Sequence, residues 1–249
     1  IGTPATEEHG LDLSLLGDCF GQLGEALHNS PSPGIILCVR STMPPGTLRH
    51  YLAPLLGDLR LGKDFHLAAN PEFLRRGHAI SDFFETPRIV IGSDDSKVAE
   101  AIERLYTGVS SPCIRTTIET AEFSKYVDNA WHALKTTFAN EIARTVMGFG
   151  GSVEDTSAIF LADHKLNISM NYLKPGFAFG GSCLTKDVKG LCYLSQELGV
   201  NTPVLNAILP SNDAHMLEAV EMIHHTGARI VGLLGLAFKP SISTVTDSA

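Results

Sequence analysis

The sequence of 249 residues has no excess of basic residues, no long apolar run and no paired-cysteine motif. Its 19 Lys and Arg residues against 27 Asp and Glu residues argue against general binding to nucleic acid or to an anionic membrane surface. No apolar run reaches the roughly 18 residues of a membrane-spanning helix. Residues 1–4 contain neither an initiator Met nor the charged leader of a signal peptide. We therefore expect a piece of a longer globular chain, with no nucleic-acid or membrane partner.

Cysteine and histidine are present but form no recognisable framework. The five cysteines include no C-x-x-C pair and are an odd number, which is typical of a reduced, cytoplasmic protein. The ten histidines include no H-E-x-x-H motif and no Cys/His cluster. We therefore expect no metal site.

The first part of the chain, residues 1–118, alternates short apolar runs with helical patterns, which is typical of a parallel α/β sheet. A helix capped by Asp94 or Asp95 should follow the third strand and reach about Tyr106. Polar turns follow the first two strands, at the edge where open α/β sheets bind ligands. The predicted strands cover residues 34–40, 65–69, 88–92 and 112–115.

The dinucleotide-binding motif G-x-G-x-x-G is missing after every predicted strand. Residues 148–151 contain three glycines but are too short to match this motif, and they follow a predicted helix instead of a strand. An intact dinucleotide-binding domain carries this loop in its first strand–helix unit. If residues 1–118 are such a Rossmann-like domain, we expect its first half to lie upstream, with residues 1–4 ending an earlier strand.

A single long helix is predicted over residues 119–149, with Thr116 or Thr117 as its cap and two glycines at its end. Because an apolar stripe of this length often needs a partner, we expect a homodimer through this helix. The stripe repeats at steps of three or four residues and consists of Phe123, Val127, Ala130, Leu134, Phe138, Ile142, Val146 and Phe149.

Polar donors line the opposite face of the same predicted helix. Lys125, Asn129 and His132 fall at positions i, i+4 and i+7 and therefore form one row. A binding face is one interpretation of this row, and an ordinary solvated helix face is the other.

A glycine-rich stretch, residues 174–187, opens a predicted helix over residues 182–191. Cys183 then lies in the first turn, where backbone N–H groups and the helix dipole favour a thiolate. Lys186 and Asp187 follow three and four residues later and share its helix face. A nucleophile, a cation and an acid/base group would converge here; a small buried apolar cysteine is the alternative.

The rest of the chain is predicted to be helical up to its last strand. A short helix and a polar connection occupy residues 152–173, and an amphipathic helix interrupted near Pro210 occupies residues 203–226. Residues 229–235 are typical of a buried strand that opens a new α/β unit. We thus expect a partial Rossmann-like sheet (1–118), an all-helical central domain (119–226) and the start of a second α/β domain (227–249).

Several spaced motifs resemble the four-electron nucleotide-sugar dehydrogenases, the UDP-glucose/GDP-mannose dehydrogenase family, whose members use NAD. The similarity covers essentially the whole chain, and segments around residues 131–142, 163–167 and 175–179 most resemble the GDP-mannose branch. The motifs are residues 2–4, 40–42, 70–75, 121–126 with Asn129, 180–183 with 186–187, and 235–240.

The resemblance implies a role for each matching residue. Cys183 would trap the sugar aldehyde as a thiohemiacetal, which a second hydride transfer converts to a thioester. Lys125 and Asn129 would stabilise the oxyanion, Asp187 beside Lys186 would serve a water, and Glu72 would assist proton transfer or thioester hydrolysis. The cofactor side would include Thr3, Ser41, Thr42, Glu72 and Lys186. The substrate side would include Phe73, Leu74, Lys125, Asn129, His132, Tyr172, Lys174 and Gly180, with Tyr172 and Lys174 reaching toward a partner subunit.

Two alternatives stay open at this point. The sugar could be UDP-glucose or a UDP-N-acetylhexosamine, because nothing in the residue pattern distinguishes guanine from uracil. Lys174 also stands where the GDP-mannose branch usually has arginine, which would cost bidentate contacts. The missing glycine-rich loop favours a second alternative, a noncatalytic dimerising fragment that binds no cofactor.

Overall fold

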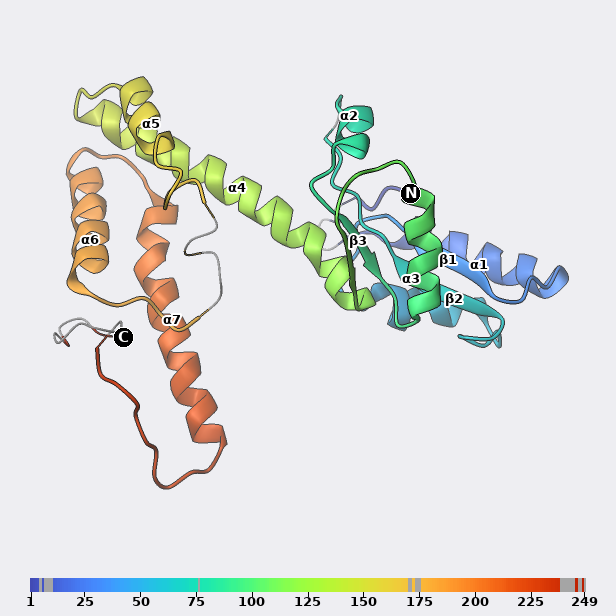
Figure 1. The fold of residues 1–249 in the computed structure, drawn as a ribbon. Coiled ribbons are helices and arrows are strands. Elements are labelled where there is room, and N and C mark those ends of the chain that lie inside the picture. Colours follow the sequence, from blue (N-terminus) through green and yellow to red (C-terminus); the bar gives the residue numbers. More distant parts are fainter. Residues whose placement is uncertain are drawn as a thin grey trace. The chain divides into compact units, whose positions relative to one another are not determined.

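The structure, a computed structural model, forms two compact units, Ile1–His132 and Ala133–Ala249. The long helix α4 (Ile118–Gly148) belongs to both, because the division falls within it (Figure 1). The side chains of Ser182 and Cys183 lie outside the description. The structure describes all residues except 5, 7–10, 76, 170–171, 173–175, 238–244, 246–247 and 249.

The first unit contains a four-stranded sheet in the order β1-β2-β3-β4. The four predicted strands are confirmed to within one residue at every end. The strands are β1 (Ile35–Val39), β2 (Phe65–Ala69), β3 (Ile89–Gly92) and β4 (Cys113–Thr116). The helices of this unit are α1 (Ser14–Asn29), η1 (Leu48–Leu52), η2 (Ala53–Leu56), α2 (Ala79–Phe84), α3 (Ser96–Glu103) and η3 (Arg104–Tyr106).

The direction of one strand pair differs from the prediction of a parallel sheet. β1 pairs with β2 and β3 with β4 in parallel, but β2 and β3 are antiparallel, with Ala69 opposite Gly92. A parallel connection requires a crossover element that covers the sheet. The connection from β2 to β3 contains only the six-residue helix α2, which has no buried residue. It therefore reverses the chain instead of crossing it.

Apolar side chains cover the sheet in two clusters. The larger cluster joins the sheet to α1, η1, η2 and the start of α4, with Phe20, Leu52, Leu67 and Ile118 among its buried members. The smaller cluster packs Val98 and Ile102 of α3 against the sheet. Asp95 caps α3 by accepting from the N–H of Lys97 at 2.8 Å, which confirms the predicted cap.

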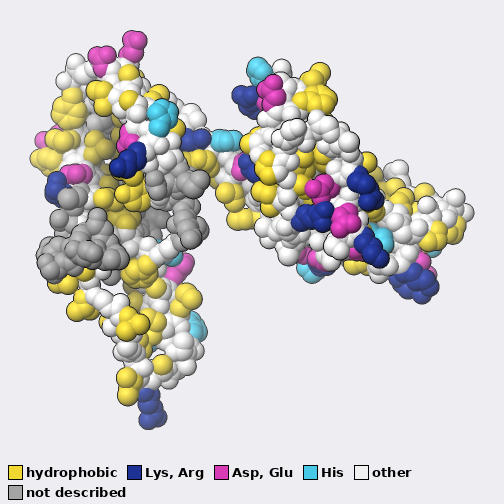
Figure 2. Space-filling view, in the orientation of Figure 1, with side chains coloured by type: hydrophobic (Ala, Val, Ile, Leu, Met, Phe, Trp, Pro, Cys, Tyr) yellow, Lys and Arg dark blue, Asp and Glu magenta, His cyan; other side chains and the backbone are white. Residues whose placement is uncertain are grey.

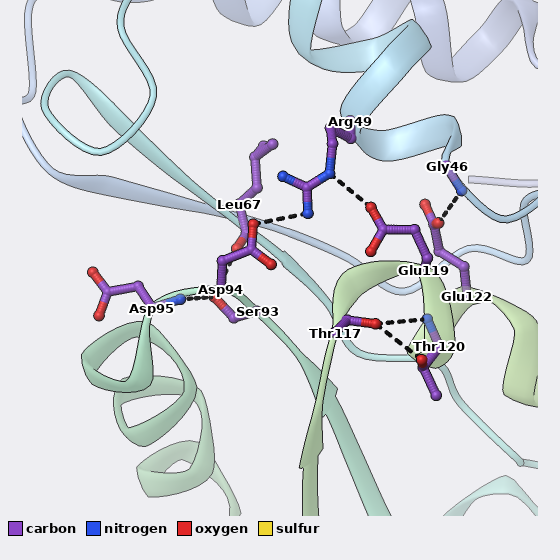
Figure 3. A network of polar contacts seen from close by, with 10 residues as sticks. All are labelled: Gly46, Arg49, Leu67, Ser93, Asp94, Asp95, Thr117, Glu119, Thr120 and Glu122. Carbon is purple, nitrogen blue, oxygen red and sulfur yellow. Dashed lines mark hydrogen bonds and ion pairs between the residues drawn. The ribbon is translucent and has the colours of Figure 1, made fainter.

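The first turns of α4 are fixed against the sheet by close packing and by a polar network (Figure 3). A Cβ atom added at Gly92 would lie 2.6 Å from the Cβ of Ala121, so only glycine allows this approach. Thr117 Oγ1 accepts from the N–H of Thr120 at 3.2 Å and is the cap. Arg49 pairs with Glu119 at 2.7 Å and with Asp94 at 2.8 Å.

Glu122 of α4 is buried and holds the start of η1. Its two carboxylate oxygens accept from the N–H groups of Gly46 and Leu48 at 2.5 and 2.9 Å, and Figure 3 shows the Gly46 contact. Burial raises the pKa of this carboxyl, although the two N–H donors oppose the shift. Glu122 therefore satisfies helix-end donors that would otherwise be buried without partners.

The second unit is helical. It contains the last part of α4 together with α5 (Val153–Leu161), α6 (Ser182–Glu197) and α7 (Pro203–His225). Glu141 of α4, which is 0% exposed, accepts from the N–H groups of Val204 and Leu205 at 2.9 and 3.0 Å. Thr145 of α4 and Ser195 of α6 join their hydroxyls at 3.0 Å. A buried carboxylate of α4 thus caps a helix in each unit, Glu122 in the first and Glu141 in the second.

Two predictions for the second unit are wrong. Helix α7 continues through Pro210 without interruption, because Pro210 and Asn206 are both exposed and water can satisfy the carbonyl freed by the proline. Residues 229–235 form no strand, and Ile230 is 91% exposed. Within the part of the chain that the structure describes, all four strands lie in the first unit, so this segment has no strand to pair with.

Apolar side chains stay exposed along α4 and on the second unit (Figure 2). Four members of the predicted stripe, Phe123, Val127, Leu134 and Phe149, are 45 to 55% exposed. Among the described helices, none combines the length and apolarity needed to cross a bilayer. The stripe therefore remains available for a partner, and the dimer remains a prediction.

A pH-dependent ion pair links the end of α1 to the turn after η2. The ring nitrogens of His28 contact the carbonyl of Gly24 at 2.6 Å and the carboxylate of Asp58 at 2.5 Å. Both partners are acceptors, so the two contacts together favour the doubly protonated, charged ring. The Asp58 contact, followed by the Gly24 contact, raises the pKa of His28 above 6.5, and His28 lowers the pKa of Asp58 below 3.8.

We expect His28→Gln to lower the melting temperature of the first unit most near pH 5. The pair's contribution is fully present below the unfolded pKa of histidine, 6.5, and is lost as pH rises through the raised folded pKa. It is also lost as acid protonates Asp58. Melting curves of both proteins from pH 5 to 9 should converge at alkaline pH, and a constant gap across this range would refute the pairing.

Candidate active site

Glu72 and Lys125 form the centre of the candidate site in the first unit. The Nζ of Lys125 on α4 lies 3.4 Å from Oε1 of Glu72, which follows β2. The other oxygen, Oε2, accepts from the N–H of Leu74 at 2.6 Å. The side chains are 13% and 34% exposed, respectively. A carboxylate and an ammonium are thus held together at the surface of the sheet unit, where they could move a proton or bind an oxyanion.

The aromatic ring of Phe73 lies beside two cations. Lys125 Nζ lies 5.5 Å from the ring centroid, and the guanidinium carbon of Arg88 lies 4.3 Å from it. Arg88 also donates to Asp128 of α4 at 2.5 Å. The backbone register explains this meeting. Extending the antiparallel pairing of Ala69 with Gly92 by four residues on each strand puts Phe73 opposite Arg88.

A second polar group lies where β1 and β2 end. Thr3 Oγ1 donates to the carbonyl of Thr42 at 2.7 Å, and Ser41 Oγ donates to the carbonyl of Ile1 at 2.7 Å. The structure thus brings together Thr3, Ser41 and Thr42, three of the five residues predicted on the cofactor side.

Asn70, the residue after β2, is buried and ties the strand ends together. Its N–H donates to the carbonyl of Val39 at 2.9 Å, and its Nδ2 donates to the carbonyl of Val90 at 2.7 Å. Tyr106 donates its hydroxyl to Asn70 Oδ1 and accepts from Arg40 at 2.8 Å. The loop that carries Glu72 therefore starts from a fixed point.

The row predicted on α4 extends beyond Lys125. Asn129 and His132 follow it by one and two turns, and both are exposed. The position of the three residues on one helix face therefore agrees with the prediction. Their roles remain predictions.

The predicted residues after position 132 belong to the second unit. Cys183 is the second residue of α6, and its side chain lies outside the described residues. Lys186 and Asp187 form an exposed ion pair at 2.6 Å. Gly181, the N-cap residue, has a φ of 95°, which favours glycine. The predicted helix start is confirmed, and α6 extends six residues past its predicted end.

Of the predicted substrate residues Tyr172 and Lys174, the structure describes only the first. Tyr172 is 83% exposed and has a φ of 64°. Lys174 lies outside the described residues. Gly180 is partly buried in the loop just before α6.

Residues of α7 hold the loop that leads into α6. The side chain of Asn212 accepts from the N–H of Phe179 at 2.9 Å and donates to its carbonyl at 3.0 Å. His215 Nε2 contacts the carbonyl of Gly176 at 2.9 Å. These contacts fix the backbone directly before the first turn of α6.

We expect Asn212→Ala to destabilise the second unit by about 1 to 2 kcal/mol, since two partly buried hydrogen bonds are lost. Hydrogen exchange at the Phe179 amide measures the loss directly. Asn212→Asp is the matched control because it retains an acceptor for that N–H. Equal exchange at Phe179 in the alanine variant and the parent would contradict the expected clamp.

Sequence reasoning missed Arg88, Asp128 and the Asn212 clamp. One available signal was the position of Asp128, three residues after Lys125 and therefore on a neighbouring part of the helix surface. Arg88 could be found only from the antiparallel register, and Asn212 only from the packing of α7. No group of three or more His, Cys, Asp or Glu side chains suited to a metal ion occurs within the described ranges.

The residues at the end of β1 are the ones for which we predict contacts with one part of a dinucleotide cofactor. Hydroxyls, backbone carbonyls and the buried Asn70 converge at the sheet edge where such ligands bind. Glu72 and Lys125 follow directly from the neighbouring strand and helix. These 249 residues contain no G-x-G-x-x-G loop for the pyrophosphate.

Two domains of one known family match the chain. The NAD binding domain of the UDP-glucose/GDP-mannose dehydrogenase family matches residues 1–110, and its central domain matches residues 119–214. The chain is 39% identical to GDP-mannose 6-dehydrogenase of Pseudomonas aeruginosa over all of its own length and 57% of that protein. It is 31% identical to UDP-glucose 6-dehydrogenase TuaD of Bacillus subtilis, covering 53% of it.

Solved structures of nucleotide-sugar dehydrogenases also match the chain. A crystal structure of a ternary complex of GDP-mannose dehydrogenase from Pseudomonas aeruginosa matches the whole chain with a TM-score of 0.96 at 39% identity. A UDP-glucose dehydrogenase from Pyrobaculum islandicum matches with a TM-score of 0.61 at 32% identity. The chain covers 57% and 58% of these two structures, respectively, so it spans little more than half the length of the relatives it matches.

Proposed function

Because the chain belongs to the UDP-glucose/GDP-mannose dehydrogenase family, we propose that it serves the NAD-dependent, four-electron oxidation of the C6 alcohol of a nucleotide sugar to a carboxylate. The observation that carries this proposal is the Glu72–Lys125 pair at 3.4 Å, on the loop and helix beside the strand ends where we place the cofactor. The carboxylate of Glu72 supplies a proton acceptor. The ammonium of Lys125 supplies a positive charge that stabilises an oxygen as it becomes negative.

The first oxidation removes a proton from the C6 hydroxyl and a hydride from C6, which yields an aldehyde. When bound, NAD supplies the hydride acceptor for this step and for the second one. In the proposal Glu72 accepts the hydroxyl proton, directly or through a water, while Lys125 and Asn129 stabilise the negative oxygen.

The second oxidation requires that the aldehyde stay bound. The Cys183 thiolate adds to the aldehyde carbon and the oxygen takes a proton, giving a thiohemiacetal. Loss of a proton from its hydroxyl and a hydride from its carbon gives a thioester. Water, served by Asp187 beside Lys186, then hydrolyses the thioester to the carboxylate and frees the thiol. Two NAD are reduced for each sugar.

We propose GDP-mannose as the substrate and GDP-mannuronate as the product. The higher identity and TM-score against the GDP-mannose enzymes support this choice over UDP-glucose. In the proposal the sugar nucleotide contacts Phe73, Leu74 and His132 of one subunit, and Tyr172 and Lys174 reach the site of a partner. Gly180 is the last residue that we place on the substrate side.

The partner would be a second copy of the chain, docked through α4. Support comes from the exposed members of its apolar stripe, which no part of the described chain covers. Cysteine usage supports a cytoplasmic location. The alternative function, a noncatalytic dimerising piece, is favoured by the missing glycine-rich loop alone.

Turnover with competing sugars tests the proposal. The protein is mixed with NAD and either GDP-mannose or UDP-glucose, and the acids formed are identified by mass spectrometry. We expect GDP-mannuronate from the first mixture and little acid from the second. Faster oxidation of UDP-glucose would overturn the substrate assignment, and oxidation of neither sugar would favour the noncatalytic alternative.

A further inference from the structure

Arg88 and Asp128 form an ion pair between the start of β3 and α4, next to the candidate catalytic residues Glu72 and Lys125. Arg88 directly precedes β3, and Asp128 lies on α4 three residues after Lys125. Their side chains meet at 2.5 Å and are 29% and 25% exposed, respectively. An ion pair this sheltered from solvent is screened less than a surface pair.

Arg88 has a second contact on the side of Glu72. Its guanidinium lies 4.3 Å from the centroid of Phe73, the residue that separates Glu72 from Leu74. Leu74 donates to the Glu72 carboxylate at 2.6 Å. Arg88 therefore contacts the side chain of the residue between Glu72 and its donor Leu74 and, through Asp128, the helix turn that follows Lys125.

The charges around Lys125 alternate in sign. Glu72 lies 3.4 Å from Lys125. Arg88 and Lys125 both lie over the ring of Phe73, at 4.3 and 5.5 Å from its centroid, and Asp128 follows Lys125 by three residues on α4. Arg88 and Asp128 neutralise each other. Their joint effect on the charge of Lys125 is therefore small, whereas the loss of either one leaves an uncompensated charge nearby.

We propose that Arg88 and Asp128 are positioning residues that keep Lys125 in contact with Glu72. Because their two charges are opposite, they do so without adding a net charge beside the ammonium of Lys125. This inference deepens the proposed function, because it assigns a supporting pair to the residues that handle the proton and the oxyanion. A role in packing alone would also connect β3 to α4, so the test must separate charge balance from packing.

Acetylation of Lys125 provides this separation, because only the neutral amine reacts. The intact chain is treated with an acetylating reagent at one alkaline pH, and labelling rates are followed by mass spectrometry. Arg88→Gln leaves Asp128 unbalanced, which favours the ammonium, so Lys125 should react roughly threefold more slowly. Asp128→Asn leaves Arg88 unbalanced, so Lys125 should react faster by a similar factor.

Opposite changes are the signature of the proposal. Loss of packing would expose Lys125 and raise its labelling rate in both variants, which would overturn the inference, as would two unchanged rates. The double variant should return the rate to within about twofold of the parent. Lys97, exposed on α3, serves as the internal control for reagent and fold. Because labelling needs neither NAD nor sugar, its result is independent of whether the proposed oxidation is observed.

Discussion

Replacing Cys183 with serine is expected to stop carboxylate formation, with a loss on the order of 10⁴-fold in the rate of acid production. Serine is close to cysteine in size, so the fold should survive. Its hydroxyl is not ionised at neutral pH and does not add efficiently to the aldehyde. The expected product is therefore an aldehyde with one NADH per sugar, measured by trapping the carbonyl and by absorbance of the reduced cofactor.

A matched variant separates the thiol chemistry from general damage to the helix. Cys192 lies on the same helix, α6, and is partly buried. Cys192→Ser should keep most of the activity. Full acid production by the Cys183→Ser protein would remove the nucleophile from the account, and equal losses in both variants would indicate a structural effect on α6.

Replacing Glu141 with alanine is expected to destabilise the second unit by about 3 kcal/mol. The carboxylate is 0% exposed and accepts from both Val204 and Leu205, so its removal leaves two donors at the start of α7 without partners. Hydrogen exchange at these two amides gives the local free energy of opening, and urea denaturation gives the free energy of unfolding.

Glu218 provides the control, because it is exposed in the middle of α7. Glu218→Ala should change stability by no more than about 0.5 kcal/mol. Glu141→Gln should fall between the two variants, since one acceptor oxygen remains. If the alanine variants at both positions lost the same stability, the capping role of Glu141 would be wrong.

Strand positions in the first unit could be predicted because buried strands leave continuous apolar runs in the sequence, as residues 89–92 do. The antiparallel direction of β3 could not, because it depends on whether α2 covers the sheet. Residues 229–235 show the limit of the same signal. They have the composition of a strand, yet a strand also needs a neighbour with free N–H and C=O groups.

In the candidate site, too, features set by local sequence patterns could be predicted, and contacts between distant residues could not. The start of α6, on which Cys183, Lys186 and Asp187 lie, was predictable from a glycine-rich loop that opens a helix, and the position of Lys125 on α4 from helical spacing. The catalytic roles of these residues stay predictions. Asn129 stays a prediction of this kind. Arg88 and Glu141 were not predictable as partners, since their contacts join residues 40 or more positions apart in the chain. Composition also gave no signal for the buried carboxylates, because charged residues are usually exposed.

The most direct test of the whole account is the number of NADH formed per GDP-mannose consumed, with the sugar limiting and NAD in excess. The account predicts two, with GDP-mannuronate as the product and no free aldehyde in solution. One NADH per sugar, accompanied by released aldehyde from the unmodified protein, would contradict the covalent role of Cys183 and with it the four-electron mechanism.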